Sequence, residues 1–302
     1  MRLFPFCIPC LIQMAITACR IGSASEEETF AVLREVMSYL AGQEYNRPAP
    51  DYSQQILEIV SKHLNQLDPF REIKKKSNQV AGRFIQRLIP YLEQATSEKD
   101  KIAQAVKIGI AGNIIDFATV PGLESQLEEK IQEALGVEFA LFELEEFLQE
   151  LKKASRILFL SDNAGELAFD RILIALLAEQ GKELRVAVKS GPALNDALWE
   201  DALEVGLDKI PGVKIITTGQ ARMGIELKTA GKEFLTSWEE ADLIISKGQA
   251  NFECLYGEKG PIYFLTMIKC QPLSSWLGLK KNQAIFCRGE KIYEQKAQAI
   301  PR

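Results

Sequence analysis

The run RILFLSDNAGE, residues 156–166, carries the strongest structural signal in this chain. Its first five residues are largely apolar and typical of a buried strand, and an apolar helical pattern follows at 167–177. A strand, a loop and a helix in this order predict an α/β sheet, in which ligands bind at the carboxyl ends of the strands. Asp162 and Asn163 lie in that loop.

The side chains of this loop have two interpretations. Carboxylate and amide oxygens are ligands that suit Mg²⁺ or Mn²⁺, whereas zinc more often recruits histidine and cysteine. Alternatively, Asp162 and Asn163 form an ordinary turn and cap the following helix, as such residues often do. The loop taken alone favours neither interpretation.

A second acidic loop follows the next apolar segment, residues 184–189. The chain there reads SGPALND over residues 190–196 and then returns to a helical pattern at 197–206. If the two strands are parallel neighbours joined by a right-handed crossover, both loops emerge at one edge and Asp196 can face Asp162. Two carboxylates and an amide oxygen would leave positions for water and phosphate on a magnesium-like ion. Capping of the helix by Asn195 or Asp196 is the alternative.

A third loop supplies positive charge. The apolar strand at 242–246 is followed by KGQANFE, residues 247–253. Lys247 is a cation beside Gly248, which permits close backbone approach, and the next helix offers unpaired amides to an anion. These features favour a phosphate-binding loop, although a surface lysine before a turn is the commoner arrangement.

Together these motifs resemble the damage-control phosphatases, a family also called acidic-residue methyltransferase-like and catalogued as domain of unknown function 89. The stand-alone prokaryotic branch is the most similar, and the resemblance covers essentially the whole chain. The motifs that carry it are SDNAGE with Phe169-Asp170, LND at 194–196 with EDA at 200–202, KGQANFE at 247–253, Cys7-Ile8-Pro9-Cys10, Asp68-Pro69-Phe70 with Lys74 and Asn78, and GNIIDF at 112–117.

The resemblance implies an α/β, Rossmann-like protein with metal-dependent phosphatase activity on small phosphorylated metabolites, such as sugar phosphates or phosphopantetheine derivatives. It implies that Asp162, Asn163 and Asp196 bind a divalent metal (Mn, Co, Ni or Mg) and that Lys247 contacts the phosphate. Whether Asp162 is only a ligand or also the nucleophile stays open. The remaining residues implied at the site are Glu166 in catalysis and Gly248, Asn251, Asn113 and Asp116 in substrate binding.

Two other functions remain open from the sequence. A methyltransferase using S-adenosylmethionine could share the open α/β sheet, but the loop at 162–165 has one glycine where a dinucleotide-type fingerprint has three. A non-catalytic protein that binds a metal or a phosphometabolite is the third class, because binding residues do not by themselves prove turnover. The single histidine, His63, disfavours multi-histidine metal hydrolysis and serine-triad hydrolysis, and we expect it to be structural.

Composition predicts a soluble cytoplasmic enzyme. The 302 residues are 47% hydrophobic and 25% charged, enough to bury a full core. A net charge of -5 argues against a nucleic-acid surface, and the basic run at residues 74–76 is most simply a solvated helix face. No apolar stretch reaches the roughly 18 to 20 residues that a membrane span needs. The oligomeric state is not determined by the sequence.

The N-terminal segment superficially resembles an export signal. Pro5, Pro9 and Gln13 interrupt its apolar run, and Cys7 and Cys10 form a Cys-x-x-Cys pair that such a signal would not need. The pair could be half a metal site, a redox disulfide or two buried thiols, with Cys270 as a third thiol. Six cysteines without secretory spacing favour a reducing compartment, and we expect the other three to be buried: Cys19, Cys254 and Cys287.

The chain divides into a helical region, 1–154, and an α/β region, 155–302, with a mostly parallel sheet flanked by helices. Ser25 and Glu28 predict a capping box, Pro90 predicts a kinked or divided helix, and we expect the helical region to cover the site through Asn113 and Asp116. One helical face is expected at Phe30, Leu33, Val36, Met37 and Leu40. Helices are expected at 52–66, 69–95, 98–111, 123–135 and 139–154, and further strands at 213–218, 243–246, 262–268 and 284–287.

Overall fold

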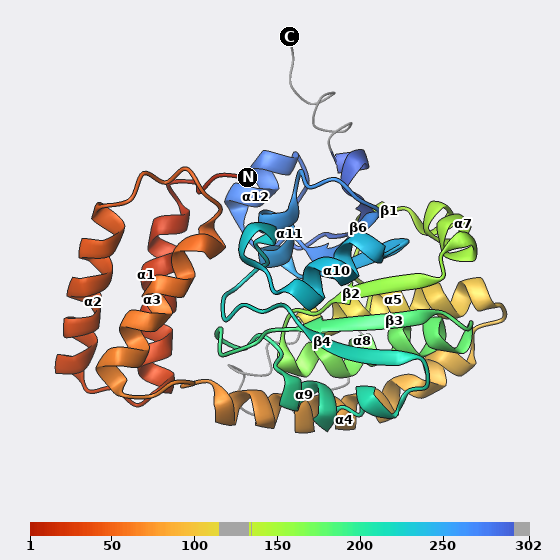
Figure 1. Cartoon of the computed structure of the whole chain (residues 1–302), viewed down its shortest axis with the longest axis horizontal. Coiled ribbons are helices and arrows are strands. Elements are labelled where there is room, and N and C mark those ends of the chain that lie inside the picture. Colours follow the sequence, from red (N-terminus) through yellow and green to blue (C-terminus); the bar gives the residue numbers. More distant parts are fainter. Residues whose placement is uncertain (115–132, 134, 293–302) are drawn as a thin grey trace, which may run out of the picture.

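A seven-stranded sheet forms the centre of the computed structural model, which describes residues 1–114, 133 and 135–292 (Figure 1). The strand order is β1-β7-β6-β5-β2-β3-β4, and every neighbouring pair is parallel except β6 with β7. The predicted α/β class and mostly parallel sheet are confirmed. The strands are β1 Phe139–Phe142, β2 Arg156–Leu160, β3 Glu183–Val188, β4 Val213–Thr217, β5 Leu243–Lys247, β6 Ile262–Met267 and β7 Ala284–Arg288.

Strand β2 marks the point where the order of the sheet reverses. From β2 the chain proceeds outward through β3 to β4, then returns to the other side of β2 as β5 and continues to β6. Such a switch point opens a crevice beyond the carboxyl ends of the strands, because the following connections leave in opposite directions. Leu160 at the end of β2 pairs with Ala187 in β3 and Ser246 in β5, so the three following loops begin side by side.

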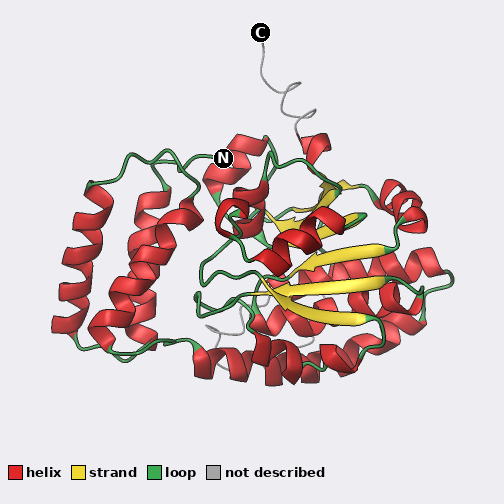
Figure 2. Ribbon diagram, viewed as in Figure 1, coloured by secondary structure: helices red, strands yellow, loops and turns green. Residues whose placement is uncertain are grey.

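Alternating side chains of the strands build two hydrophobic layers. Ile157 and Phe159 of β2 face one layer of helices, and Leu158 and Leu160 face the other. Figure 2 shows helices on both faces of the sheet. The first layer contains α5 Glu98–Ile114, α7 Leu144–Lys153 and α8 Ala164–Glu179, with α4 Arg71–Glu93 and α9 Trp199–Glu204 packed beside α8; the second contains α10 Lys232–Glu240, α11 Gln249–Leu255 and α12 Gln271–Leu277.

A three-helix unit stands beside the sheet and has a hydrophobic cluster of its own (Figure 1). It consists of α1 Cys7–Ile21, α2 Glu26–Ala41 and α3 Ala49–Leu64. The buried ion pair between Asp51 of α3 and Arg222, which precedes η3 (Leu227–Thr229), joins this unit to the α/β body. The predicted N-terminal helical region is therefore present, and its first three helices form a distinct layer.

Details of this unit agree with the sequence only in part. The capping box of Ser25 and Glu28 is formed, with Ser25 N donating to Glu28 Oε2 at 2.7 Å and Glu28 N to Ser25 Oγ at 3.2 Å. The expected apolar face is partly wrong, because Phe30 and Met37 are 54% and 49% exposed while Val32 is buried. Helix α2 sits at the edge of the unit, so only the narrow stripe of Val32, Val36 and Leu40 reaches the core.

Two other helix predictions need correction. The predicted helix at 139–154 begins only at Leu144, because Phe139–Phe142 pairs with β7 as strand β1. A short apolar run is ambiguous between strand and helix, and the free edge of β7 selects the strand here. Of the two outcomes predicted for Pro90, division of the helix does not occur, because α4 continues to Glu93, while a kink stays a prediction. Almost all of the helix expected at 123–135 lies outside the described residues.

The basic run at 74–76 is not a uniform solvated face. Lys74 is only 3% exposed, and its ammonium lies 2.7 Å from Asp68 Oδ2, whereas Lys75 and Lys76 are exposed as expected. Position 74 lies on the same inward face of α4 as Ser77, Asn78 and Ala81. Across the described part of the chain, no helix combines the length and apolar character that crossing a lipid bilayer demands.

The burial of Lys74 makes a direct prediction. Replacing Lys74 by Ala leaves Asp68 with an unpaired, mostly buried charge and should lower the free energy of unfolding by about 3 kcal/mol. The matched substitution Lys75→Ala removes an exposed lysine from the same helix and should change it by less than about 0.5 kcal/mol. Urea unfolding followed by circular dichroism measures both. Equal, small effects would show that the ion pair contributes nothing to the fold.

Candidate functional site

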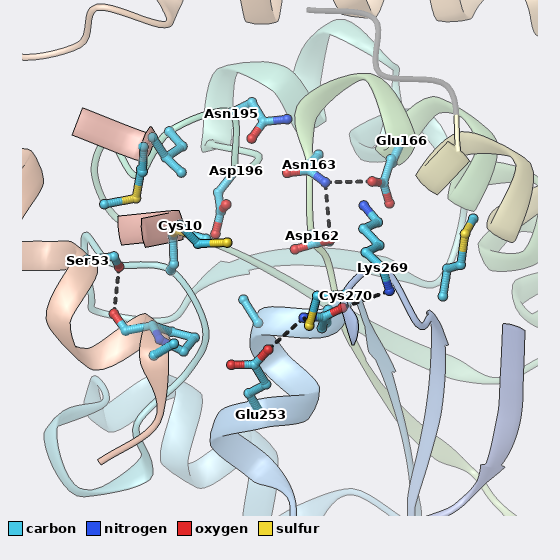
Figure 3. A pocket seen from close by; sticks show the side chains of 18 of the residues that line it. Cys10, Ser53, Asp162, Asn163, Glu166, Asn195, Asp196, Glu253, Lys269 and Cys270 are labelled. Atoms are coloured by element: carbon cyan, nitrogen blue, oxygen red, sulfur yellow. Dashed lines mark hydrogen bonds between the residues drawn. The ribbon is translucent and has the colours of Figure 1, made fainter. Parts of the chain in front are cut away.

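A cavity of about 720 Å³ lies between the carboxyl edge of the sheet and the three-helix unit. The loops after β2, β3 and β6 and helix α11 form one wall, including Asp162, Asp196 and Lys269. Helices α1 and α3 form the opposite wall, which is mainly apolar and includes Leu11 and Pro50. Figure 3 shows the polar side chains converging on this space.

The two acidic loops meet as the sequence indicated. Asn163 and Asp196 form an antiparallel backbone bridge, the amide of Ala164 donates to Asn195 O at 2.9 Å, and the amide of Ala197 donates to Asp162 O at 2.8 Å. Asp162, Asn163 and Asp196 therefore line the same cavity although 34 positions separate the two aspartates in the sequence. The capping alternative explains neither aspartate well, since neither side chain is recorded as capping a helix and Asn163 makes no side-chain cap of α8.

Burial destabilises the ionised forms of the Asp162 and Asp196 carboxylates. Removal from water, with the charges of Glu166 and Asp196 nearby, raises the pKa of Asp162 to about 8. Removal from water also raises the pKa of Asp196 to about 6, although the Lys189 ammonium, 3.5 Å from Oδ2, opposes this rise. A positive charge placed between the two side chains would favour their ionised forms. The two loops would therefore be stabilised either by a bound cation or by protonation of the aspartates.

The donor set suits a hard divalent ion. Asn163 Nδ2 donates to Asp162 Oδ2 at 3.1 Å and to Glu166 Oε1 at 2.5 Å, which leaves its Oδ1 as an acceptor. Asp196 Oδ2 is buried, and the Lys189 ammonium lies 3.5 Å from it, at the limit of hydrogen-bond distance. Within the part of the chain that the structure describes, no three carboxylate, thiol or imidazole groups converge closely enough to hold a metal by themselves. A bound ion would therefore need the Asn163 amide and water or phosphate oxygens, the coordination that Mg²⁺ commonly has.

Lys247 lies behind the pocket wall. Its side chain is 0% exposed, and its ammonium donates to Asp170 Oδ1 at 2.5 Å and to Gly109 O at 3.0 Å, with Glu166 Oε2 at 3.7 Å. Burial lowers the pKa of Lys247, but the charges of Asp170 and Glu166 outweigh this effect and raise it, so the lysine stays charged. Lys247 is not among the residues lining the cavity, which differs from the position that the sequence suggested.

Lys269 is a pocket cation that the sequence reasoning missed. It lines the cavity and its charge lowers the pKa of Asp162, so the ammonium lies near that carboxylate. Figure 3 shows its side chain extending toward Asp162, Asn163 and Glu166. The signal was present, because Lys269 comes at the end of an apolar segment expected to be a strand, as Asp162 and Asp196 do. Lys189, which holds Asp196, was also missed and ends the segment 184–189 in the same way.

Gly248 and Asn251 support the aspartate loop from behind. Gly248 has a φ of +84°, and a Cβ atom there would lie 2.0 Å from Asp162 Oδ2, so the glycine gives that carboxylate its place. Asn251 Nδ2 donates to Ser161 O at 3.0 Å and to Lys247 O at 2.8 Å, which ties α11 to the loop after β2. Neither residue lines the cavity.

The remaining expected residues have mixed outcomes. Asn113 is in α5, but its side chain and all of Asp116 lie outside the described residues. Within the described residues, the helical region covers the site through α1 and α3 and also through Ser77, Glu133 and Val137. His63 pairs with Glu35 at 2.7 Å between α3 and α2, away from the cavity, as a structural histidine would. All six cysteines are free; Cys19 and Cys287 are buried, Cys254 is half-buried, and the three that line the cavity are Cys7, Cys10 and Cys270.

Comparisons with known proteins agree on one family. The family model described as damage-control phosphatase ARMT1-like domain matches residues 3–285. A damage-control phosphatase of Pyrococcus horikoshii is 35% identical over 290 residues, covering 94% of this chain and 97% of that protein. A damage-control phosphatase of Archaeoglobus fulgidus is 30% identical (94% and 98% covered), and an uncharacterised protein of Methanocaldococcus jannaschii is 32% identical (95% of each).

A solved structure extends this similarity to three dimensions. The crystal structure of a DUF89 family protein from Pyrococcus horikoshii superposes with a TM-score of 0.86 at 30% sequence identity. The match covers 96% of this chain and 99% of that one. The sheet and the three-helix unit therefore belong to one shared architecture, and the matched span contains all three loops of the site.

Gly248 allows a test of the close approach to Asp162. Gly248→Ala should displace the Asp162 carboxylate and weaken the Mn²⁺ binding expected at this loop by about 10-fold or more, because changes to residues that position metal ligands typically have effects of this size. Gly181→Ala is the matched control, since Gly181 also has a positive φ (+74°) but a Cβ there meets nothing within 4 Å. Calorimetry of Mn²⁺ binding compares the two. Equal losses would mean that backbone strain, not the carboxylate contact, causes the effect.

The raised pKa of Asp162 predicts how metal-free stability depends on pH. Its pKa is about 8 in the folded chain against an ordinary 3.8, so the folded state holds the proton more tightly and stability falls as the pH rises toward 8. Asp162→Asn removes this charge in a nearly isosteric way. Without metal, the variant should melt roughly 5 °C above the wild type at pH 9 and at a similar temperature at pH 5.

Differential scanning fluorimetry with and without a chelator measures this difference. Added Mn²⁺ should raise the melting temperature of the wild type more than that of Asp162→Asn, because the variant has lost one anionic ligand. A metal-free wild type as stable as the variant at pH 9 would show that Asp162 is not electrostatically stressed.

Proposed function

The chain belongs to the damage-control phosphatase ARMT1-like family, and from this premise we propose that it is a divalent-metal-dependent phosphatase of small phosphorylated metabolites. One observation carries the proposal most directly. Asp162, Asn163 and Asp196 arrive from two loops at the switch point of the sheet, line one cavity, and bring two buried carboxylates and an amide oxygen together there.

In this proposal Asp162, Asn163 and Asp196 hold the ion. When bound there, a divalent cation would act as a Lewis acid on a phosphate oxygen and would lower the pKa of a coordinated water. Lys189 keeps Asp196 in place through its 3.5 Å ion pair, and Gly248 and Asn251 fix the loop that carries Asp162. Mn, Co, Ni and Mg are all compatible with an oxygen donor set of this kind.

Phosphate recognition falls to Lys269 in this proposal, rather than to Lys247. Lys269 lines the cavity beside Asp162 and can offset the charge of a bound phosphate group. Lys247 neutralises Asp170 and Glu166 behind the wall, so it preserves the site without touching the substrate. Glu166 is held by Asn163 and lines the cavity, where it can orient a water molecule or accept its proton.

The cavity also bears on the substrate and on the location of the reaction. About 720 Å³ is within the range of small-molecule sites and is large enough for sugar phosphates or phosphopantetheine-type esters. Helices α1 and α3 cover the polar edge and limit the access of bulk water to the phosphate. We place the enzyme in the cytoplasm, where six free thiols remain reduced.

The proposal is tested by phosphate release from a panel of phosphate esters assayed with Mn²⁺, Co²⁺, Ni²⁺ and Mg²⁺. Activity should require one of these ions and disappear with a chelator. Asp162→Ala and Asp196→Ala should each lower kcat/KM by about 100-fold or more. Retention of full activity by either variant, or by the chelated enzyme, would refute metal-dependent hydrolysis. Binding of S-adenosylmethionine without phosphate release would instead indicate a methyltransferase.

The two lysines can be separated in the same assay. Lys269→Ala should raise KM by about 10-fold while the melting temperature stays near that of the wild type, because its ammonium faces the cavity. Lys259→Ala, an exposed lysine beyond α11, is the control and should change neither. Lys247→Ala should lower the melting temperature, since it leaves Asp170 buried and unpaired with its cation. An unchanged KM in Lys269→Ala would remove Lys269 from phosphate binding.

A further inference from the structure

The part of the cavity formed by α11 contains a carboxylate that the proposed hydrolysis does not use. Glu253 lines the cavity with Cys7, Cys10 and Cys270, and Figure 3 shows its carboxylate pointing into the space between Cys10 and Cys270. It belongs to neither acidic loop and lies on a different element from every residue assigned to the metal or the phosphate. Its surroundings indicate what it could bind.

Gln249 fixes the position of Glu253. The Gln249 side chain donates from Nε2 to Glu253 Oε1 at 2.7 Å and to Cys270 Sγ at 3.5 Å, and its Oε1 accepts from the Lys269 amide at 3.0 Å. All four residues of this chain of contacts line the cavity. The carboxylate is therefore held in one orientation by the same segment that positions Lys269, and it is ready to accept a second hydrogen bond.

The negative charge of Glu253 is poorly compensated. Burial raises its pKa to about 7, and only the Gln249 hydrogen bond and the amino group of Met1 oppose this rise. Two further titratable neighbours are the thiols of Cys7 and Cys254, whose pKa values burial raises and which therefore stay protonated. No arginine or lysine forms an ion pair with Glu253 within the described residues. A hydrogen-bond donor on a ligand, above all a positively charged one, would compensate the charge of Glu253.

The opposite wall of the cavity indicates the chemical character of the rest of the ligand. Leu11 and Met14 of α1 and Ala49 and Pro50 of α3 line the cavity with apolar surface. A ligand that fills the space therefore meets cations and hard oxygens at one part, an apolar wall along its length, and a single acceptor at another. A free phosphate ion would use only the first of these features.

We propose that Glu253 is a specificity subsite that binds a protonated amine or another N–H donor on the organic group of the phosphate ester. This inference rests on the proposed phosphatase function and adds a substrate class to it: phosphate monoesters with an apolar linker and a terminal nitrogen donor. Gln249 is a positioning residue for this subsite, since it holds the carboxylate and does not itself supply the charge.

The test compares two series of simple esters with Mn²⁺ at pH 8.5: ω-aminoalkyl phosphates with two to six carbons, and n-alkyl phosphates of the same lengths. At this pH Glu253 is ionised and the amines are protonated. The wild type should favour the amine over its alkyl partner by about 10- to 100-fold in kcat/KM at one chain length, set by the span between the phosphate site and Glu253. Glu253→Gln should reduce that ratio to near one.

Matched variants and outcomes separate this subsite from the catalytic function. Glu258→Gln alters an exposed glutamate just beyond α11 and should preserve the wild-type ratio. Hydrolysis of both series with no amine preference at any length would overturn the subsite alone, even if Glu253→Gln failed to fold. A preference that survives in folded Glu253→Gln would overturn it as well. No hydrolysis of either series by an enzyme that is active on the wider panel of esters would overturn this inference alone, whereas no hydrolysis of any ester in that panel would overturn the proposed function and this inference with it.

Discussion

The backbone bridge between Asn163 and Asp196 is the constraint on which the site depends. Without it, the loops after β2 and β3 would be free to separate, and two buried carboxylates would move apart to regain water. Neighbouring parallel strands bring the loops to one edge, but the bridge and the flanking amide contacts of Ala164 and Ala197 hold them together. Backbone hydrogen bonds thus hold Asp162 and Asp196 close together despite the unfavourable burial of their charges, and the stability of the sheet compensates for that cost.

Three lysines offset the negative charge of the carboxylates at this edge of the sheet, and each approaches them from a different side. The Lys189 ammonium pairs with Asp196 and also contacts α11 and the Gly224 carbonyl. Lys247 neutralises Asp170 and Glu166 beneath α5, and Lys269 faces the cavity. Of these three lysines, only Lys269 lies where it can contact a ligand in the cavity. Lys189 and Lys247 are paired with buried carboxylates, so Lys269 is the one of these three lysines that lines the cavity beside the two aspartates.

The sequence predicted the sheet, its polar edge and the meeting of Asp162 with Asp196, because strand ends in a parallel sheet necessarily share an edge. It placed Lys247 incorrectly within that scheme, since β5 runs one residue further than expected and strand alternation puts Lys247 on the face of Leu243 and Ile245, toward the α5 and α8 layer. Lys269, which follows the end of β6, would have been found by the strand-end rule that found the two aspartates. Phe30 and β1 could not be assigned from local pattern, because their environment is set by helix packing and by the free edge of β7.

Strand β1 and helix α5 show that the helical region is more than a cover. Phe139–Phe142 completes the edge of β7, and Ile102, Val106 and Ile110 of α5 belong to the same hydrophobic cluster as the strands. A fragment that began at residue 155 would therefore expose the unpaired edge of β7 and the part of the sheet face that α5 and α7 cover, a surface of the kind that promotes self-association. Truncation at the apparent boundary between the two regions would thus cut through the packing of the sheet.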